Sequence, residues 1–124
     1  MDRNKPVILV VDDISTNLIL VQALLRGKDY EVITAQSGIH ALAIAEERKP
    51  DLILLDIMMP EMDGYEVLAR LRSNENTKDI KVVIISALAN DADIRNAMNL
   101  GADAYLPKPI FAKKLYEVIE QFVK

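Results

Sequence analysis

Five polar side chains of this sequence could together bind a cation and a phosphate group. They are two adjacent acids, a third acid, a hydroxyl and an ammonium group, each following a short apolar run: Asp12, Asp13, Asp56, Ser86 and Lys108. Three carboxylates within a few ångströms of one another repel, so they destabilise a fold unless a cation lies between them. Clustered oxygen ligands with no histidine or cysteine nearby favour Mg²⁺, which usually takes one or two carboxylates and keeps several waters. The set therefore predicts a magnesium site, provided that the fold brings these residues together.

Each of these residues also has a simpler interpretation. An acid after a strand often caps the next helix, and Asp12 or Asp13 could do so. Ser86 could be a turn hydroxyl, and Lys108 a solvated surface charge. These interpretations account for the residues one by one, but they do not account for the combination of three acids, a hydroxyl and an ammonium group.

The same set fits phosphoryl transfer. A phosphoryl group in transfer spreads its negative charge over three oxygens, and catalysis is mainly positioning and electrostatic stabilisation. Magnesium can take one oxygen, Lys108 a second, and the Ser86 hydroxyl with a nearby backbone N–H the third. Ser86 has no histidine beside it to act as a base, whereas a carboxylate needs none and can form an aspartyl phosphate.

Apolar runs that are typical of buried strands position these side chains. The strongest are 7–11, 51–55 and 81–85, where consecutive β-forming residues favour strands covered on both faces. The runs 31–35 and 103–106 are weaker, so we place them nearer the edges of the sheet.

Amphipathic stretches that favour helices fill the intervals between the runs. They are 14–25, 39–48, 64–71, 91–100 and 111–122. Ile14 is the first residue of the apolar stripe predicted for the first helix, and Phe111 is the first of the stripe predicted for the last.

Helix-capping residues agree with these boundaries. Ser37 and Asn90 are suitable N-caps, while Gly27 and Gly101 are suitable terminators. Five alternating strand–helix units predict an α/β fold with a parallel sheet, right-handed crossovers and helices on both faces. In such sheets the functional crevice lies beyond the carboxyl ends of the strands.

Length and composition narrow the class of protein. The 124 residues suit one domain, and the absence of cysteine excludes disulfides and a thiol nucleophile. A net charge of −4 gives no reason to expect nucleic-acid binding, and no apolar run approaches a membrane span. We therefore expect a cytoplasmic location. His40, the only histidine, falls in the second predicted helix away from the acids, so we interpret it as solvent-facing.

The chain resembles the receiver domain of two-component response regulators over essentially its whole length. Five motifs in the usual order carry the resemblance: 11–13 (VDD), 56–64 (DIMMPEMDG), 86–87 (SA), 99–103 (NLGAD) and 105–109 (YLPKP). The resemblance implies a flavodoxin-like (βα)5 fold, a doubly wound five-stranded parallel sheet in three αβα layers with strand order 2-1-3-4-5. It also implies one receiver domain over residues 1–124, with no output domain in this chain.

The resemblance implies a role for each site residue. Asp56 is the expected phosphoacceptor, and the expected magnesium ligands are Asp13, Asp56, Asp12 through a water, and the backbone carbonyl of Met58. The expected partners of the phosphoryl group are Lys108, Ser86 and the backbone N–H of Ala87. A cis bond is expected between Lys108 and Pro109. Gly64 is expected to shape the loop after Asp56 by its freedom to adopt positive φ.

A switch follows from the same resemblance. Ser86 is expected to move toward the phosphoryl group, and Tyr105 to turn from an exposed to a buried rotamer in the space left behind. The changed surface would comprise the helix 91–100, the strand 103–106 and the last helix. From the residues alone, a tyrosine in a short edge strand is more simply half-buried packing.

Partners and alternatives complete the prediction. The phosphodonor is expected to be a sensor histidine kinase or a phosphotransfer protein, and the phosphorylated domain is expected to control an unknown output partner or a fused domain. The domain is expected to be a monomer or a weak phosphorylation-dependent dimer, and not an enzyme with an external product. Met58, Met59 and Met62 could form a docking rim for a kinase helix or could anchor the loop.

Four alternative classes fit the residues less well. An aspartyl-nucleophile phosphatase usually has an acid two residues after the nucleophile, where Met58 stands. No G-x-G-x-x-G follows the first strand, which argues against dinucleotide binding. A flavin carrier would place its phosphate against the acids, and a pure interaction module would not need the complete acidic set.

Overall fold

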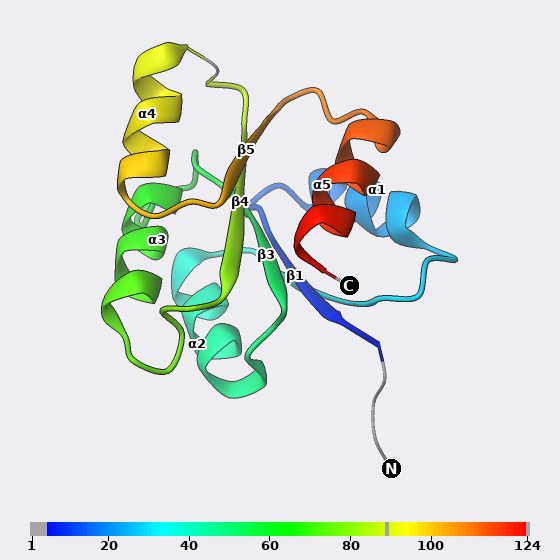
Figure 1. Cartoon of the computed structure of the whole chain (residues 1–124), viewed down its shortest axis with the longest axis horizontal. Helices are drawn as coiled ribbons and strands as arrows, with labels where there is room; N and C mark the ends of the chain where they lie inside the picture. The colour runs from blue at the N-terminus through cyan, green and yellow to red at the C-terminus, as the bar shows by residue number, and fades with distance from the viewer. Residues whose placement is uncertain (1–4, 89, 124) are drawn as a thin grey trace.

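The computed structural model describes residues 5–88 and 90–123 of the chain, which alternate regularly between strands and helices (Figure 1). The elements in order are β1 (Val7–Val11), α1 (Ser15–Leu25), β2 (Glu31–Ala35), α2 (Gly38–Arg48), β3 (Leu52–Asp56), α3 (Gly64–Ser73), β4 (Lys81–Ser86), α4 (Asp91–Asn99), β5 (Ala104–Pro107) and α5 (Ala112–Phe122). Each predicted strand and helix is therefore present. None of the helices in the described part of the chain is long and apolar enough to cross a membrane.

The five strands form one parallel sheet in the order β2-β1-β3-β4-β5. Helices α1 and α5 cover one face, and α2, α3 and α4 cover the other (Figure 1). This is the flavodoxin-like topology that the sequence predicts, with the weaker strands β2 and β5 at the edges. Because all strands run in the same direction, their carboxyl ends share one edge of the sheet.

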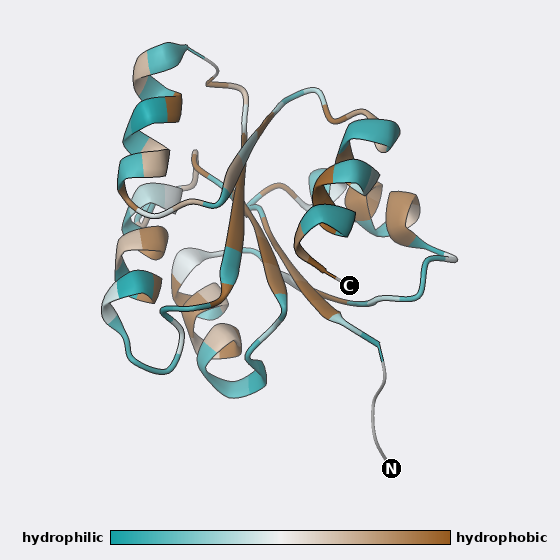
Figure 2. Cartoon of the chain, viewed as in Figure 1, coloured by the Kyte–Doolittle hydropathy of each residue, from teal (hydrophilic) through white to brown (hydrophobic). Residues whose placement is uncertain are grey.

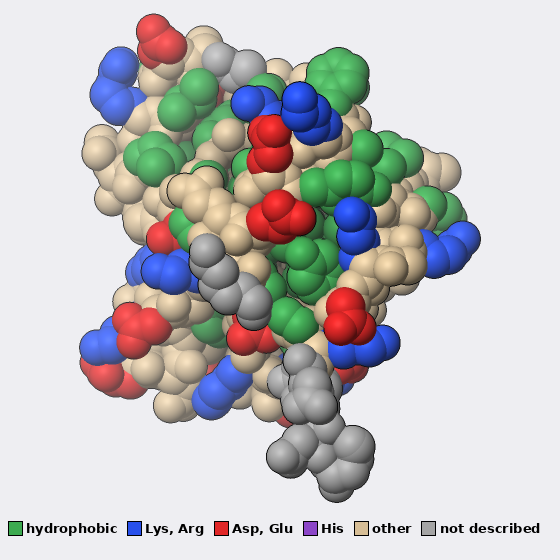
Figure 3. Space-filling model, turned by 45° about the vertical axis from the view of Figure 1, so that its right-hand side comes forward, with side chains coloured by type: hydrophobic (Ala, Val, Ile, Leu, Met, Phe, Trp, Pro, Cys, Tyr) green, Lys and Arg blue, Asp and Glu red, His purple; other side chains and the backbone are tan. Residues whose placement is uncertain are grey.

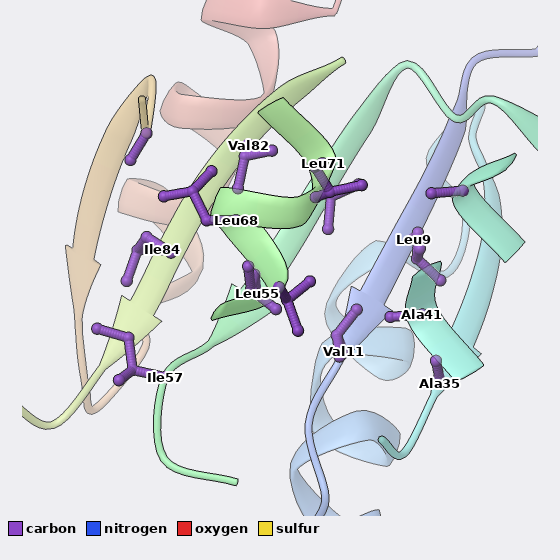
Figure 4. Packing of buried hydrophobic residues seen from close by; sticks show 14 of the residues in the cluster. Leu9, Val11, Ala35, Ala41, Leu55, Ile57, Leu68, Leu71, Val82 and Ile84 are labelled. Atoms are coloured by element: carbon purple, nitrogen blue, oxygen red, sulfur yellow. The ribbon is translucent and has the colours of Figure 1, made fainter. Parts of the chain in front are cut away.

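Two apolar clusters form the core, one on each face of the sheet. Successive residues of β1 and β3 point to opposite faces: Leu9 and Leu55 join the cluster beneath α2, α3 and α4, while Ile8 and Leu54 join the cluster beneath α1 and α5. Figure 4 shows Leu68 of α3 above Leu55 in the first cluster. The helices turn their hydrophobic sides toward the sheet, as Figure 2 shows. Burial of the central strands on both faces explains their continuous apolar runs.

The predicted helix caps are confirmed. The Ser37 hydroxyl accepts a hydrogen bond from the His40 N–H at 3.1 Å, and the Asn90 side chain accepts one from the Asp93 N–H at 2.9 Å. Gly27 and Gly101 follow their helices with φ of +84° and +109°, the left-handed region in which glycine is favoured. His40 is exposed on α2, as expected for a solvent-facing residue.

Two residues assigned to apolar helical stripes lie outside them. Ile14 and Phe111 occupy the N-cap positions of α1 and α5, where the backbone is extended, and their side chains are 51% and 67% exposed. The apolar spacing placed the N-cap residue on each helical stripe. An N-cap residue has an extended backbone, so its side chain does not point in the direction that helical periodicity predicts.

The boundaries of three strands also differ slightly from the prediction. Asp56 and Ser86 are the last residues of β3 and β4 rather than the first residues after them, and β5 begins at Ala104. Asp103 precedes β5 because its carboxylate turns back to accept the Val82 N–H at 2.8 Å. None of these shifts changes the edge at which the functional side chains emerge.

Arg72, in the last turn of α3, holds together the loops that precede β4 and β5, at the amino-terminal ends of the strands. Its guanidinium donates to the carbonyls of Gly101 at 2.8 and 3.0 Å, Ile80 at 2.7 Å and Lys78 at 2.9 Å. It also donates to the Asp103 carboxylate at 3.0 Å, and only 21% of the Arg72 side chain is exposed. This one side chain thus holds the start of β4 and the chain between α4 and β5 against α3.

Candidate functional site

Three carboxylates meet at the carboxyl edge of β1 and β3. Each of Asp12, Asp13 and Asp56 contributes an oxygen, and these oxygens all lie within 4.8 Å of one another. Asp12 and Asp56 are each only 5% exposed. The predicted convergence of the three acids is therefore confirmed, and it places charged groups where solvation alone cannot stabilise them.

Asp12 is held by the start of α1. Its two carboxylate oxygens accept hydrogen bonds from the Ile14 N–H and from the side-chain amide of Asn17, each at 3.0 Å. The helix-capping interpretation is thus partly correct, although the N-cap residue itself is Ile14. Sequence reasoning missed Asn17 as a site residue. Its signal was the five-residue spacing from Asp12, which brings the first turn of the helix back over the strand end.

Lys108 lies between two of the acids. Its Nζ is 3.3 Å from an oxygen of Asp12 and 3.3 Å from an oxygen of Asp56, and 24% of its side chain is exposed. The Lys108 N–H donates to the Ser86 carbonyl at 2.9 Å, and the bond between Lys108 and Pro109 is cis, as expected. The interpretation of Lys108 as a solvated surface charge is therefore wrong.

The charge balance of the cluster favours a further cation. Burial raises the pKa of Asp56, the negative charge of Asp12 raises it further, and Lys108 only partly opposes these effects. One oxygen of Asp13, Oδ1, is buried and has no hydrogen-bond partner among the described residues. An unsatisfied carboxylate oxygen beside two buried acids is the arrangement that a hard divalent ion would complete. The residues present therefore fit a magnesium ion.

A buried hydroxyl borders the acidic cluster. Ser86 is fully buried, and its Oγ accepts the Leu88 N–H at 3.0 Å, so the turn interpretation of this serine also holds. The Tyr105 hydroxyl donates to the Leu88 carbonyl. Tyr105 is half-buried, as the packing interpretation predicts, and burial raises its pKa. The backbone of Leu88 thus links the hydroxyls of Ser86 and Tyr105.

The loop after Asp56 requires glycine at position 64 for a reason that the sequence did not show. A Cβ on Gly64 would collide with the Asp56 carbonyl oxygen and come within 2.7 Å of the Ile57 Cα. Gly64 does not adopt positive φ; Glu61 does, at +68°. The expectation of positive φ at Gly64 is therefore wrong, and the glycine is needed because the start of α3 packs directly on the backbone at the end of β3.

The three methionines of this loop differ in burial. Met58 is 60% exposed, Met59 is 8% exposed, and Met62 is half-buried against the core cluster. Met59 and Met62 thus anchor the loop, whereas Met58 alone could serve as a docking contact.

An apolar cavity of about 440 Å³ opens beside Asp56, between α1 and the chain before α5. Apolar residues such as Leu20, Leu54 and Ile110 line it, together with Ala87 and with Asp12, Asp56 and Lys108 of the acidic cluster. Figure 3 shows hydrophobic side chains gathered among charged ones on the side of the molecule where α1 and α5 lie. The acidic cluster is therefore accessible from an apolar surface.

Fold and site together define a class: doubly wound α/β domains with an acid cluster, a lysine and a hydroxyl at the strand ends, which act as phosphoryl-accepting switches. Residues 8–120 match the family described as the response regulator receiver domain, and the chain belongs to this family. It is accordingly a receiver domain of two-component signalling, and its acidic pocket fits a magnesium site.

Two curated relatives show different extents of overlap. The response regulator PleD of Caulobacter vibrioides is 48% identical over 103 residues, which cover 83% of this chain but 23% of PleD. The chain thus spans about a quarter of the length of that relative. The polar-differentiation response regulator DivK of Brucella ovis is 35% identical over 116 residues, which cover 94% of each chain.

Solved structures agree with the fold. The receiver domain of the sensor histidine kinase PA1611 from Pseudomonas aeruginosa, with a magnesium ion coordinated in its active-site cleft, has a TM-score of 0.87 and 30% identity over 95% of this chain and 97% of that one. The chemotaxis protein CheY4 of Vibrio cholerae has a TM-score of 0.90 and 27% identity over 96% and 99% of the two chains.

Proposed function

We propose that Asp56 accepts a phosphoryl group from the phosphohistidine of a sensor histidine kinase or a phosphotransfer protein, in a magnesium-dependent reaction. The observation that carries this proposal is the cluster itself: three carboxylates within 4.8 Å, Lys108 between two of them, and a buried oxygen of Asp13 without a partner. A carboxylate oxygen of Asp56 attacks phosphorus, the P–N bond to the histidine breaks, and the imidazole leaves as the neutral ring after taking up a proton.

The residues around Asp56 then have defined tasks. Asp13, Asp56, the Met58 carbonyl and, through water, Asp12 would hold the magnesium ion, which neutralises the acids and supplies positive charge to the phosphoryl oxygens. Lys108 exchanges its contact with the Asp56 carboxylate for one with the phosphoryl group. The Ser86 hydroxyl and the Ala87 N–H donate hydrogen bonds to the phosphoryl oxygen that neither magnesium nor Lys108 contacts. Ala87 is exposed and lines the cavity beside Asp56, so its N–H is near the expected position of the group.

The phosphodonor would approach over the apolar surface beside the cavity. Ile14, Leu20 and Phe111 are 51%, 48% and 67% exposed, and Leu20 also lines the cavity. Exposed large apolar side chains next to a buried reactive group suit a transient docking surface. A helix that presents a histidine between apolar residues would match this surface.

The output follows from the chain of contacts at Leu88. When Ser86 turns toward the phosphoryl group, the Leu88 backbone moves with it, and Tyr105 repacks, which changes the surface of α4, β5 and α5. That surface would control an output partner or a fused domain. The domain acts on itself, by its own phosphorylation and dephosphorylation, rather than as an enzyme with an external product. The cytoplasmic location and a monomeric or weakly dimeric state stay predictions.

Intact-mass measurement after incubation with a small phosphodonor and Mg²⁺ tests the proposal. Wild type is expected to gain the mass of one phosphoryl group, and Asp56→Asn is expected to gain none. Asp63→Asn is a matched control, because Asp63 is exposed in the same loop and asparagine also caps helices. A gain in Asp56→Asn equal to that of wild type, or no gain in wild type, would overturn the proposal.

A further inference from the structure

Tyr65, in the first turn of α3, buries a hydroxyl group without a hydrogen-bond partner. Its phenolic oxygen is buried, and no described residue completes a hydrogen bond with it. Buried tyrosine hydroxyls usually find a partner, because leaving one unpaired costs free energy that phenylalanine would not incur. Packing alone therefore does not explain why position 65 carries a hydroxyl in this arrangement of the chain.

The ring of Tyr65 lies beside the loop after Asp56 and the loop after Ser86. Tyr65, Leu88 and Tyr105 all pack against the core cluster beneath α3 and α4. A cavity of about 440 Å³ is lined by Met58, Asp63, Tyr65 and Leu88 among others, so it joins the loop after Asp56 to the loop after Ser86. Side chains next to this cavity have room to move.

The polar groups of α4 that act on the Tyr65 hydroxyl belong to Asn96 and Asp93. Burial is the main cause of the raised pKa of Tyr65, a hydrogen-bonding interaction with the Asn96 side chain partly lowers it, and the negative charge of Asp93 raises it further. The Asn96 side chain therefore lies close enough to interact with the Tyr65 hydroxyl, but the contact falls short of the distance and angles of a full hydrogen bond. Figure 1 agrees, since the later turns of α4 lie beside the start of α3. A small displacement of α4 would be enough to complete the bond.

Helix α4 is fixed at one end and lightly packed elsewhere. Its only fully buried residue is Ala97. Beyond its C-terminal end, the Gly101 carbonyl accepts two hydrogen bonds from Arg72, at 2.8 and 3.0 Å. The N-terminal end follows Leu88, whose N–H donates to the Ser86 hydroxyl. A pull on Leu88 would therefore turn α4 about its C-terminal end.

We propose that Tyr65 is a positioning residue of the switch: when α4 shifts on phosphorylation of Asp56, the Tyr65 hydroxyl donates a hydrogen bond to the side-chain carbonyl of Asn96 and holds the helix in its shifted position. The bond is absent in the unphosphorylated arrangement and present in the other, so it biases the equilibrium between them. This inference rests on the proposed function, because the shift begins at Asp56.

Tyr65→Phe tests the proposal because it keeps the ring and removes the hydroxyl. The shift is driven by Mg²⁺ with beryllium trifluoride, a tetrahedral mimic of a phosphoryl group on a carboxylate. The ratio of shifted to resting molecules is then read from the amide NMR signals of Ala97 and Met98. We expect this ratio to fall about fivefold in the variant, the effect of one net hydrogen bond. The melting temperature of unmodified Tyr65→Phe is expected to equal or exceed that of wild type.

Two further variants distinguish a switch role from a structural one. Asn96→Ala is expected to reproduce the loss, and the double variant with Tyr65→Phe is expected to lose no more than either single variant. Tyr116→Phe is the matched control, because the Tyr116 hydroxyl is already bonded to the Leu24 carbonyl at 2.6 Å. It should lower the melting temperature and leave the population ratio unchanged.

The proposal is overturned if Tyr65→Phe shows the wild-type population ratio, if it melts lower as Tyr116→Phe does, or if its effect adds fully to that of Asn96→Ala. Intact-mass measurement with a small phosphodonor separates this result from the proposed function. All the variants should still gain one phosphoryl group. If wild type gains none, it is the proposed function that fails.

Discussion

Replacing Arg72 by methionine should destabilise the domain by far more than a surface substitution on the same helix. Methionine keeps an unbranched apolar stem but removes every hydrogen bond of the guanidinium. The exposed Lys78 carbonyl can turn to water at little cost. The part-buried carbonyls of Gly101 and Ile80 lose charged donors, at roughly 1 kcal/mol or more each. The loss of the partly buried pair with Asp103 adds up to about 1 kcal/mol.

The expected loss in the free energy of unfolding is thus about 3 kcal/mol, or roughly 10 °C in melting temperature for a domain of this size. Urea unfolding followed by far-UV circular dichroism measures it directly. Arg72→Lys should lose most of the same free energy, because an ammonium group cannot reach the four acceptors that the planar guanidinium bridges.

Arg70→Met is the matched control. Arg70 lies two residues earlier on α3, and among the residues that the structure describes its side chain pairs only with Glu66; the two side chains are 57% and 47% exposed. Its loss should cost about 0.5 kcal/mol or less. If Arg72→Met and Arg70→Met differ by less than about 1 kcal/mol, the reasoning about buried carbonyls is wrong.

Three other perturbations act on the site itself. Gly64→Ala should lower the melting temperature and slow phosphorylation of Asp56, because its Cβ collides with the Asp56 backbone; normal values for both in thermal melts and mass spectra would contradict the proposed close approach. Folding raises the pKa of Asp56, so the folded chain loses stability as pH rises through that pKa. Without metal, Asp56→Asn should therefore be more stable than wild type at pH 7 and equally stable below about pH 4, where the carboxyl group is protonated. A difference in urea midpoints that stays constant across pH would refute this. Magnesium at ten times its dissociation constant should raise the free energy of unfolding of wild type by about 1.4 kcal/mol. In thermal melts at increasing magnesium concentration, Asp13→Asn should need much more magnesium than wild type for the same rise in melting temperature. If both proteins need the same concentration, Asp13 is not a ligand.

Much of the fold could be predicted from sequence because its strongest signals are local. The run 7–11 is apolar at every position, and the runs 51–55 and 81–85 are apolar after their first residues, Asp51 and Lys81; only strands covered on both faces keep so many consecutive apolar side chains from water. The convergence of Asp12 and Asp56 then follows from topology, since parallel strands end at the same edge. The strand order itself came from the resemblance to receiver domains, because five βα units alone do not determine it.

The contacts that the sequence did not predict are of two kinds. Some join residues far apart in the chain, and others depend on how closely two backbone segments approach, which no sequence pattern reports. Arg72 contacts Gly101, 29 residues away, and nothing in a helical pattern distinguishes it from the exposed Arg70. Gly64 was assigned the right importance for the wrong reason, since a missing side chain and a positive φ leave the same residue in the sequence. Ile14 and Phe111 were wrongly included in the apolar stripes because the sequence pattern does not locate the exact residue at which a helix begins.

The two ends of the sheet differ in how completely their polar groups are satisfied, and this difference bears on how the domain can switch. At the amino-terminal edge, the guanidinium of Arg72 is fully engaged by carbonyls and a carboxylate. Of the side-chain atoms that are buried without a partner in the described residues, both lie toward the carboxyl edge: Oδ1 of Asp13 and the hydroxyl of Tyr65. Unsatisfied buried groups cost free energy, and proteins keep them where a ligand or a second conformation satisfies them. A cation would satisfy the first and a shift of α4 the second, so both events lower the free energy of the same end of the molecule. Since Arg72 holds the opposite end fixed, the free energy released by the proposed phosphorylation of Asp56 would drive movement of α4 rather than loosen the whole sheet.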